Sequence, residues 1–314
     1  MNNHIKIAVV GLGGVGGYIA GVLGKICDNL TVVARGKRMQ AIKKNGLVLD
    51  SQYSGNIVTH PSVVENAREL GEQDIIFICV KNYSLDAACE ELQDVVKKDT
   101  IIVPVMNGIE PGDKVRKLLG KGIVVDSLIY IVSYAKADYS ITQEGDFVKI
   151  NIGIKSNQIS TKEKEAIKKV YEVLNNAKIN CNASENIEKE IWLKYILNCA
   201  FNVETAYYNN TIGELRKDKE KEREYISLIT EAYKVALKKG ISIRQQEIDE
   251  IISKFYGYRE DATSSLQRDI REGKMSEADV FSGYIVREAE KLGVSVPVSK
   301  KMYEKLAGRN SNSI

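Results

Sequence analysis

A glycine-rich segment directly after a short apolar run is the feature that most constrains this chain. The run Ile5–Val10 has the β-branched composition of a buried strand, and Gly11-Leu12-Gly13-Gly14-Val15-Gly16-Gly17 follows it and opens a helical pattern. In the order G-x-G-x-x-G, the first glycine permits a tight turn, the second lets a pyrophosphate approach, and the third lets helix and strand pack closely. Free N–H groups at the helix N-terminus would bind that pyrophosphate. The segment therefore predicts a dinucleotide site, with a purely structural turn as the alternative; its residues are Gly11, Leu12, Gly13, Gly14, Val15 and Gly16.

The end of the second predicted strand indicates which dinucleotide would bind. Leu30–Ala34 is followed by Arg35, with Lys37 and Arg38 close behind and no Asp or Glu at that point. An NAD site places a carboxylate on the ribose 2′-OH about 20 residues after the glycines, whereas an arginine suits a 2′-phosphate. We therefore expect NADP (NADPH) with Arg35 at its 2′-phosphate. The alternative is that these cations are solvated loop charges.

Strand-like and helical segments alternate through the first half of the chain. The predicted strands are Ile5–Val10, Leu30–Ala34, Ile75–Val80, Ile101–Pro104 and Ile123–Val132. The predicted helices are Val15–Ile26, Arg38–Asn45, Leu85–Val96 and Gly112–Leu119. This alternation favours an α/β fold with a Rossmann-type, doubly wound parallel sheet. Polar–apolar alternation across Tyr139–Ile154 predicts antiparallel strands at the edge of that sheet.

The second half of the chain has a helical pattern throughout. Ser184 is a candidate N-cap, with Glu185 and Glu188 in the first turn of the helix that follows. Further helices are expected at Lys217–Lys239, Arg244–Tyr256, Ser264–Glu272 and Ser276–Leu292, before a frayed tail at Gly308–Ile314. We therefore expect an NADP-binding Rossmann domain over residues 1–183 and an all-helical C-terminal domain over residues 184–314.

Charge and composition exclude several classes of protein. The formal net charge is +3, from 45 Lys and Arg against 42 Asp and Glu, and neither half is strongly basic, so no nucleic-acid partner is expected. No apolar run approaches the roughly 18 residues of a membrane helix, and the start does not resemble a signal peptide. The 5 cysteines form no C-x-x-C pair, as is typical of reduced thiols in a cytoplasmic protein without a metal site. With 2 histidines, His4 and His60, acid–base chemistry is expected to use lysine or a carboxylate.

One apolar helical segment carries a polar stripe. Within Ile187–Ala206, Lys194, Asn198 and Asn202 follow one another at a spacing of four residues, so they share one face of the helix. Asparagine in a helix interior lowers helix propensity and needs hydrogen-bond partners when buried. Three such residues on one face therefore indicate a wall of a ligand-binding site.

Other polar residues stand where strands or helices begin and end. Segments 264–270 and 276–279 combine serines with acidic residues, a pattern that is also ordinary at helix starts. Lys81 follows the third predicted strand, and Asn107-Gly108 follows the fourth. Ligands of doubly wound sheets bind at the carboxyl ends of strands. Lys81 and Asn107 are therefore candidate ligand contacts, with a surface lysine and an Asn-Gly turn as the alternatives.

Taken together, these segments resemble the ketopantoate reductase family (2-dehydropantoate 2-reductase), and the resemblance spans nearly the whole chain. The matching segments are the glycine motif with Arg35, Val80-Lys81, Asn107-Gly108, Trp192-x-Lys194-x-x-x-Asn198-Cys199-x-x-Asn202, Thr205-Ala206, Gly213-Glu214-Leu215, Ser264-Ser265 with Asp269, Glu277 and Asp279, and Val296-Pro297. The combination is specific for the family, although no single piece of it is.

The resemblance implies NADPH-dependent reduction of 2-dehydropantoate to pantoate, a step of pantothenate and coenzyme A biosynthesis. It implies that Lys194 is the general acid, and a lysine suits a chain with so few histidines. It implies substrate contacts from Asn107, Asn198, Asn202 and Ser265. It implies cofactor contacts from Lys81, Asn107, Ala135 and Glu277, with Glu277 also orienting the lysine.

Three departures from the family pattern bear on the substrate: Ile212, Ser282 and Ser299. Another branched 2-oxo acid therefore remains an alternative substrate. A non-catalytic NADP-binding sensor is a further alternative, although a sensor has little need for the intact lysine, asparagines and glutamate. The expected partner is a small 2-oxo acid, with no membrane, and the resemblance also implies a homodimer.

Overall fold

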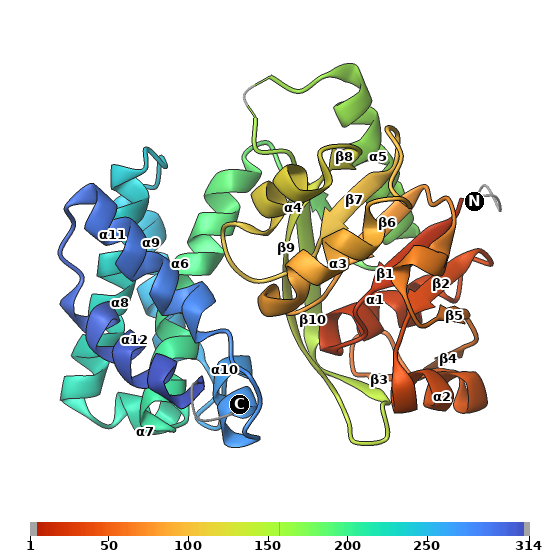
Figure 1. The fold of residues 1–314 in the computed structure, drawn as a ribbon. Helices are drawn as coiled ribbons and strands as arrows, with labels where there is room; N and C mark the ends of the chain where they lie inside the picture. The colour runs from red at the N-terminus through yellow and green to blue at the C-terminus, as the bar shows by residue number, and fades with distance from the viewer. Residues whose placement is uncertain (1–4, 157, 311–314) are drawn as a thin grey trace. The chain divides into compact units, whose positions relative to one another are not determined.

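The computed structural model describes residues 5–156 and 158–310, so His4 lies outside the described residues. The chain forms two compact units, Met1–Ile187 and Glu188–Ile314, which are described one at a time (Figure 1). The predicted fold class is confirmed, because a parallel sheet with helices is followed by a helical unit. No helix among the described residues is long and apolar enough to cross a membrane.

A six-stranded parallel sheet forms the centre of the first unit, in the order β5-β2-β1-β6-β7-β8. Its strands are β1 (Ile7–Val10), β2 (Leu30–Val33), β5 (Ser62–Val64), β6 (Ile75–Ile78), β7 (Ile101–Pro104) and β8 (Ile123–Val124). The helices of the unit are α1 (Gly14–Leu23), α2 (Gly36–Asn45), α3 (Leu85–Leu92), α4 (Pro111–Leu119) and α5 (Thr161–Asn176), with 3-10 turns at Ala67–Leu70 and Asn82–Ser84. The first four predicted strands agree with the structure to within two residues at each end.

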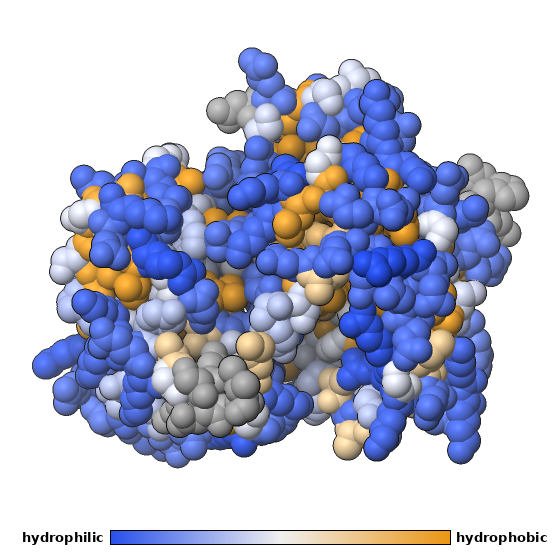
Figure 2. Space-filling model, in the orientation of Figure 1, coloured by the Kyte–Doolittle hydropathy of each residue, from blue (hydrophilic) through white to orange (hydrophobic). Residues whose placement is uncertain are grey.

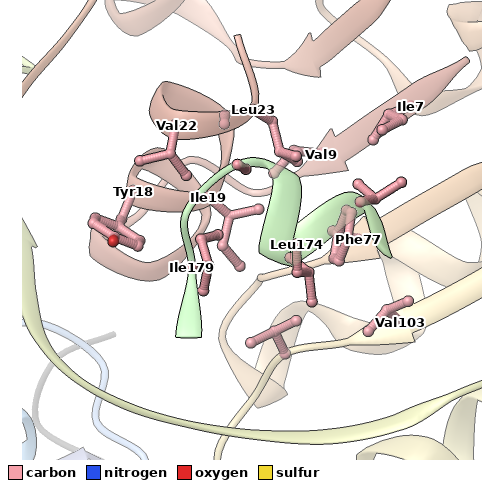
Figure 3. Close-up of a cluster of buried hydrophobic side chains, with 14 of the residues drawn as sticks. Ile7, Val9, Tyr18, Ile19, Val22, Leu23, Phe77, Val103, Leu174 and Ile179 are labelled. Atoms are coloured by element: carbon pink, nitrogen blue, oxygen red, sulfur yellow. The ribbon is translucent and has the colours of Figure 1, made fainter. Parts of the chain in front are cut away.

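Both faces of this sheet are buried. In β1, Ile7 and Val9 pack in the same core as α1 and α5 (Figure 3). Ala8 and Val10 point the opposite way and pack with α3 and α4. The strands are therefore continuously apolar rather than alternating, as expected for a parallel sheet with helices on both sides.

Strands from before and after β8 form a second sheet. Its order is β11-β10-β3-β4, and β9 pairs with β10. Its strands are β3 (Leu47–Ser51), β4 (Ile57–Thr59), β9 (Asp126–Ala135), β10 (Ile141–Gly153) and β11 (Asn180–Ala183). The prediction that Tyr139–Ile154 lies at the edge of the parallel sheet is therefore wrong. The single predicted strand Ile123–Val132 is also wrong, since the chain leaves the first sheet at Val125.

Helix α1 explains where the second sheet lies. Gly17 and Gly21 have no side chain to hold a neighbour away, so Ile141 of β10 and Leu49 of β3 pack directly on the helix. Ile141 and Leu49 are each at most 1% exposed, and they belong to the same core as the helix and β1. Burying this apolar face of β3 and β10 against α1 outweighs adding them to the edge of the parallel sheet.

The second unit is helical. Its helices are α6 (Ile187–Tyr208), α7 (Ile212–Arg216), α8 (Lys219–Lys238), α9 (Gln245–Gly257), α10 (Ser265–Arg271), α11 (Tyr284–Leu292) and α12 (Pro297–Asn310), with a π-helical turn at Asp279–Gly283 directly before α11. The π-helical turn was not predicted. The tail prediction is wrong for residues 308–310, which extend α12, while residues 311–314 lie outside the described residues.

The predicted N-cap of α6 is wrong. The helix begins at Ile187, three residues after Ser184, whose hydroxyl accepts a hydrogen bond from the N–H of Asn186 at 3.1 Å. Glu188 lies in the first turn as predicted, and Glu190 joins it, while Glu185 precedes the helix. The carboxylates of the first turn stabilise the positive end of the helix.

Hydrophilic residues cover most of the face of the molecule shown in Figure 2, and the apolar residues on it lie in separate patches. All 5 cysteines are free thiols, and four of them are buried. Burial raises the pKa of Cys89 to about 11 and that of Cys181 to about 12, so these thiols are uncharged at neutral pH.

Candidate functional site

The glycine turn joins β1 to α1 in the manner that its spacing predicts. Gly11 has φ +92°, a conformation that side chains disfavour. A Cβ on Gly16 would lie 1.9 Å from the Gly11 carbonyl oxygen, so the helix contacts the turn backbone directly. At Gly13, by contrast, a Cβ would meet no atom of the described residues within 4 Å. The turn is thus closed on its strand side and open at the N-terminus of α1, where a pyrophosphate would bind.

Neighbouring backbone lines the same helix N-terminus. A Cβ on Gly14 would lie 2.2 Å from the carbonyl oxygen of Ser133, so β9 passes close to the first turn of α1. Ala135 lies two residues further along β9 and packs against the core of the unit, as does Val15. The guanidinium of Arg38 donates a hydrogen bond to the Leu12 carbonyl and therefore holds the glycine turn against α2.

An arginine and a glutamate, the charges that suit NADP and NAD respectively, lie beside the end of β2. Arg35 precedes α2, and its side chain is 63% exposed and ion-paired with Glu91. Its Nε also donates to the Glu65 carbonyl oxygen at 3.3 Å. The Glu65 carboxylate accepts a hydrogen bond from the Gly36 N–H at 3.2 Å. Nothing in the local sequence indicates this carboxylate, because Glu65 follows β5, which is brought beside β2 by sheet pairing alone.

The ends of β6 and β7 come together, as predicted for neighbouring parallel strands. The side-chain amide of Asn82 donates to the Asn107 carbonyl oxygen at 2.9 Å. Lys81 immediately precedes Asn82, and both Lys81 and Asn107 are partly exposed. Gly108 follows with φ +105°, which lets the chain turn sharply after Asn107. Lys81 and Asn107 therefore lie near one another at the carboxyl ends of β6 and β7.

In the second unit, helix α6 presents the polar stripe. Asn202 is 5% exposed, and its side-chain carbonyl accepts a hydrogen bond from the Ser265 hydroxyl at 3.2 Å. Ser264 caps α10 by accepting from the Gln267 N–H at 3.1 Å, and its hydroxyl lies 2.7 Å from that of Thr205. Helix α10 is therefore tied to α6 at its first residues, which brings Asn202 and Ser265 together as the resemblance implied.

Lys194 and Glu277 form the charged pair of the site. Lys194 is partly exposed, one helical turn before Asn198, while Glu277 is 5% exposed. Loss of solvent around the ammonium lowers the pKa of Lys194 to about 8, and the charge of Glu277 partly offsets this effect. The lysine therefore carries a proton at neutral pH that it releases more readily than an ordinary lysine does.

Comparison with known proteins places the chain in a family. Residues 7–157 match the family described as ketopantoate reductase PanE/ApbA, and residues 186–310 match the family of its C-terminal part. The chain belongs to the ketopantoate reductase family. Among curated relatives, it is 28% identical to the uncharacterized oxidoreductase YkpB of Bacillus subtilis, over 96% of this chain and 98% of the relative. It is 26% identical to 2-dehydropantoate 2-reductase of Pyrococcus horikoshii, over 98% of both chains.

Solved structures show the same fold. A PanE/ApbA family ketopantoate reductase from Ralstonia eutropha superposes with a TM-score of 0.89 at 24% identity, covering 98% of this chain and 99% of that one. A D-mandelate dehydrogenase, solved with NADH and anilino(oxo)acetate, gives a TM-score of 0.86 at 21% identity with the same coverage. This oxidoreductase fold therefore occurs in proteins with different 2-hydroxy acid substrates.

The three departures from the ketopantoate reductase pattern lie in buried surroundings. Ile212 is fully buried, and Ser282 and Ser299 are each 2% exposed. The hydroxyl of Ser299 donates to the Glu231 carboxylate at 2.7 Å, which also accepts the Ser299 and Val298 N–H groups at 2.8 and 3.0 Å. Ser299 therefore helps to hold the Glu231 carboxylate at the N-terminus of α12.

Two features of this member of the ketopantoate reductase family were not predicted from the sequence. Tyr195 and Cys199 follow Lys194 and Asn198 on α6, and both contact the π-helical turn at Asp279–Gly283. For Tyr195, the available signal was an aromatic residue directly after the lysine of the polar stripe. Glu204 is fully buried on α6, where a charged residue among apolar neighbours was the available signal.

Proposed function

We propose that this ketopantoate reductase family member reduces 2-dehydropantoate to pantoate with NADPH, and that Lys194 is the proton donor. The observation that carries the proposal is the pairing of Glu277 with Lys194, a residue of α6 on the same helix face as Asn198 and Asn202. Reduction of a ketone needs a hydride at carbon and a proton at the developing alkoxide. NADPH supplies the hydride when bound, and the glycine turn with its open N-terminus fits a pyrophosphate.

The residues of the second unit supply the rest of the chemistry. The Lys194 ammonium donates its proton to the alkoxide oxygen, and its positive charge stabilises that oxygen before the proton moves. Asn198, Asn202 and Ser265 would bind the hydroxyl and carboxylate of the substrate. Asn202 and Ser265 already form a hydrogen bond, so the two side chains are held in place before substrate arrives.

The substrate is tested by a panel assay. Oxidation of NADPH and of NADH should be followed with 2-dehydropantoate, other branched 2-oxo acids and phenylglyoxylate, the 2-oxo acid that corresponds to mandelate. We expect the highest kcat/KM with 2-dehydropantoate and NADPH. A higher value with another acid would make the protein a reductase of that acid, and no turnover with any of them would favour the sensor.

Arg35 provides a test of the cofactor. Replacing it with glutamine should raise the Kd for NADPH by about 10–100-fold, because a charged hydrogen bond to a phosphate contributes about 1.5–3 kcal/mol. The Kd for NADH should change much less, since NADH has no 2′-phosphate. Titration of cofactor fluorescence measures both. Arg68→Gln is the matched control, because Arg68 is also an exposed, ion-paired arginine of this unit. Equal losses for both cofactors would assign cofactor choice to Glu65 instead.

We further propose that residues 1–183 form the NADP-binding domain and residues 184–314 the substrate-binding and catalytic domain. In the first, Lys81, Asn107 and Ala135 would contact the cofactor, and in the second Glu277 would do so. The cytoplasmic location and the homodimer stay predictions.

A further inference from the structure

The segment that carries Glu277 enters α11 through an unusual backbone. Residues Asp279–Gly283 form a π-helical turn, and the N–H of Tyr284 donates to the carbonyl of Asp279, five residues earlier. A π-helical turn interrupts the regular ladder of an α-helix and is frequent at functional sites. A buried carbonyl group that such a turn leaves unpaired needs a hydrogen-bond donor from outside the helix.

Tyr195 supplies that donor from α6. Its hydroxyl lies 2.8 Å from the Val280 carbonyl oxygen and 2.7 Å from the Phe281 carbonyl oxygen, and it donates to this pair. The thiol of Cys199, one turn later on α6, makes a weaker contact of 3.7 Å to the Phe281 carbonyl. Because Tyr195 is 2% exposed, this hydrogen bond is shielded from water.

The ring of Tyr195 is held as firmly as its hydroxyl. It packs edge-on against Trp192 and Tyr284, with ring centroids 5.7 Å away in each case, and it stacks on Phe281 at 6.5 Å. Such aromatic contacts stabilise one orientation of the side chain. The hydroxyl therefore approaches the π-helical turn from a position that α6 determines.

The far side of the turn is also held. Arg287 binds the Asp279 carboxylate through two hydrogen bonds of 2.6 and 3.0 Å, and the Tyr303 hydroxyl donates to the same carboxylate at 2.8 Å. A Cβ on Gly283 would lie 2.4 Å from Asp279 Oδ1, so the turn packs tightly against this group. The turn is thus clamped between α6 on one side and α11 and α12 on the other.

Lys194 and Tyr195 are adjacent on α6, and their partners Glu277 and Val280 are three residues apart on the segment that α6 contacts. Resting on the function proposed above, we propose that Tyr195 is a positioning residue: its hydroxyl holds the π-helical turn and thereby holds Glu277 against Lys194. The carboxylate then stays close enough to stabilise the ammonium from which the proton is donated. Tyr195 itself donates nothing to the substrate.

The hydroxyl can be removed while the ring is kept. In Tyr195→Phe, the turn loses its donor, Glu277 moves more freely, and its stabilisation of the ammonium weakens. Because burial of the lysine remains, the pH at which half of Lys194 is deprotonated should fall by about half a unit to one unit. Competitive acetylation of lysines across neutral to alkaline pH, followed by mass spectrometry of the Lys194 peptide, measures this midpoint without substrate.

Activity gives a second readout. The alkaline limb of kcat/KM should move to lower pH by the same amount. Tyr233→Phe is the matched control, because its hydroxyl also donates to a backbone carbonyl, that of Ile243 at 3.2 Å. The control should leave both the Lys194 midpoint and the limb where they are in the wild type.

A second variant keeps the proposal testable if Tyr195→Phe does not fold. Tyr303→Phe removes the hydroxyl that binds Asp279 on the far side of the same turn, and it should shift the midpoint in the same direction by a smaller amount. An unchanged midpoint in a folded Tyr195→Phe protein would overturn the proposal. A shifted midpoint in a protein that reduces no 2-oxo acid would uphold the role of Tyr195 and reject the proposed function.

Discussion

Replacing Lys194 with alanine should lower kcat for 2-oxo acid reduction by about 10²–10⁴-fold, the usual effect of losing a general acid. The variant loses both the proton donor and the charge that stabilises the alkoxide. Binding of NADPH should persist, because the glycine turn and Arg35 belong to the other unit. Steady-state kinetics and a fluorescence titration of NADPH measure the two properties separately.

The same lysine predicts the pH dependence of the wild-type protein. A general acid must carry its proton, and the pKa of Lys194 is lowered to about 8 by loss of solvent. Turnover should therefore be constant below that pH and should fall about tenfold for each further unit of pH. The residual activity of Lys194→Ala should not show this fall with rising pH.

Lys189→Ala is the matched control for this experiment. Lys189 lies on the same helix, but it forms an ion pair of 2.8 Å with Glu247 on α9. Its loss should change kcat by less than about threefold, because Lys189 has no proposed contact with the substrate. The protein should also stay folded, since a partly exposed ion pair contributes about 1 kcal/mol or less to stability. Near-wild-type turnover in Lys194→Ala would reject the lysine as proton donor.

Replacing Glu204 with glutamine should stabilise the protein at neutral and alkaline pH. Glu204 is fully buried, and neither of its carboxylate oxygens has a hydrogen-bond partner among the described residues. Burial raises its pKa to about 9, and the charges of Glu224 and Asp218 add to this effect while Lys221 opposes it. The hydroxyls of Tyr208 and Tyr225 also lie close enough to interact with the charge of Glu204.

The sign of the effect follows from proton binding. The unfolded chain releases this proton near pH 4.5, whereas the folded chain keeps it up to about pH 9. Between these values the free energy of unfolding falls as pH rises, by about 1.4 kcal/mol per unit. Glutamine cannot ionise, so Glu204→Gln should be more stable than the wild type by about 5 kcal/mol at pH 8 and within about 1 kcal/mol of it at pH 5. Urea unfolding at several pH values measures this difference.

Glu231 is the natural control because it is equally a glutamate buried in the second unit, at 5% exposure. Its carboxylate accepts hydrogen bonds from two backbone N–H groups and the Ser299 hydroxyl. Glu231→Gln should therefore destabilise the protein by about 1–3 kcal/mol, the opposite sign to Glu204→Gln. A parallel pH dependence in Glu204→Gln and the wild type would show that Glu204 is ionised in the folded state.

Features encoded by neighbouring residues could be predicted from the sequence. The first four strands and the opening of α1 depend on local composition and on the glycine spacing, and they lie where they were expected. Lys194, Asn198 and Asn202 share a face because of the helical period alone. The family resemblance named both Asn202 and Ser265 as substrate contacts, but their hydrogen bond to one another joins residues 63 apart in the chain and was not predicted.

Features that depend on packing between distant segments could not be predicted. The second sheet exists because Ile141 and Leu49 pack against glycines of α1, and nothing near those strands in the sequence indicates it. Glu65 reaches the end of β2 through the pairing of β5 with β2. The π-helical turn is held by hydrogen bonds from α6, α11 and α12. Of these helices only α11 is next to the turn in the chain, so a helical pattern read along the sequence does not reveal it.

The glycines of α1 limit how this protein can change in evolution. Gly14, Gly17, Gly21 and Gly24 recur every three or four residues, and a methyl group on any of them would lie 3.0 Å or less from an atom of the second sheet. In a mutational library these positions should tolerate almost no replacement, even conservative ones. New cofactor or substrate preferences would then have to arise elsewhere, at the exposed residues around Arg35 and Glu65 and along the partly exposed side chains of α6.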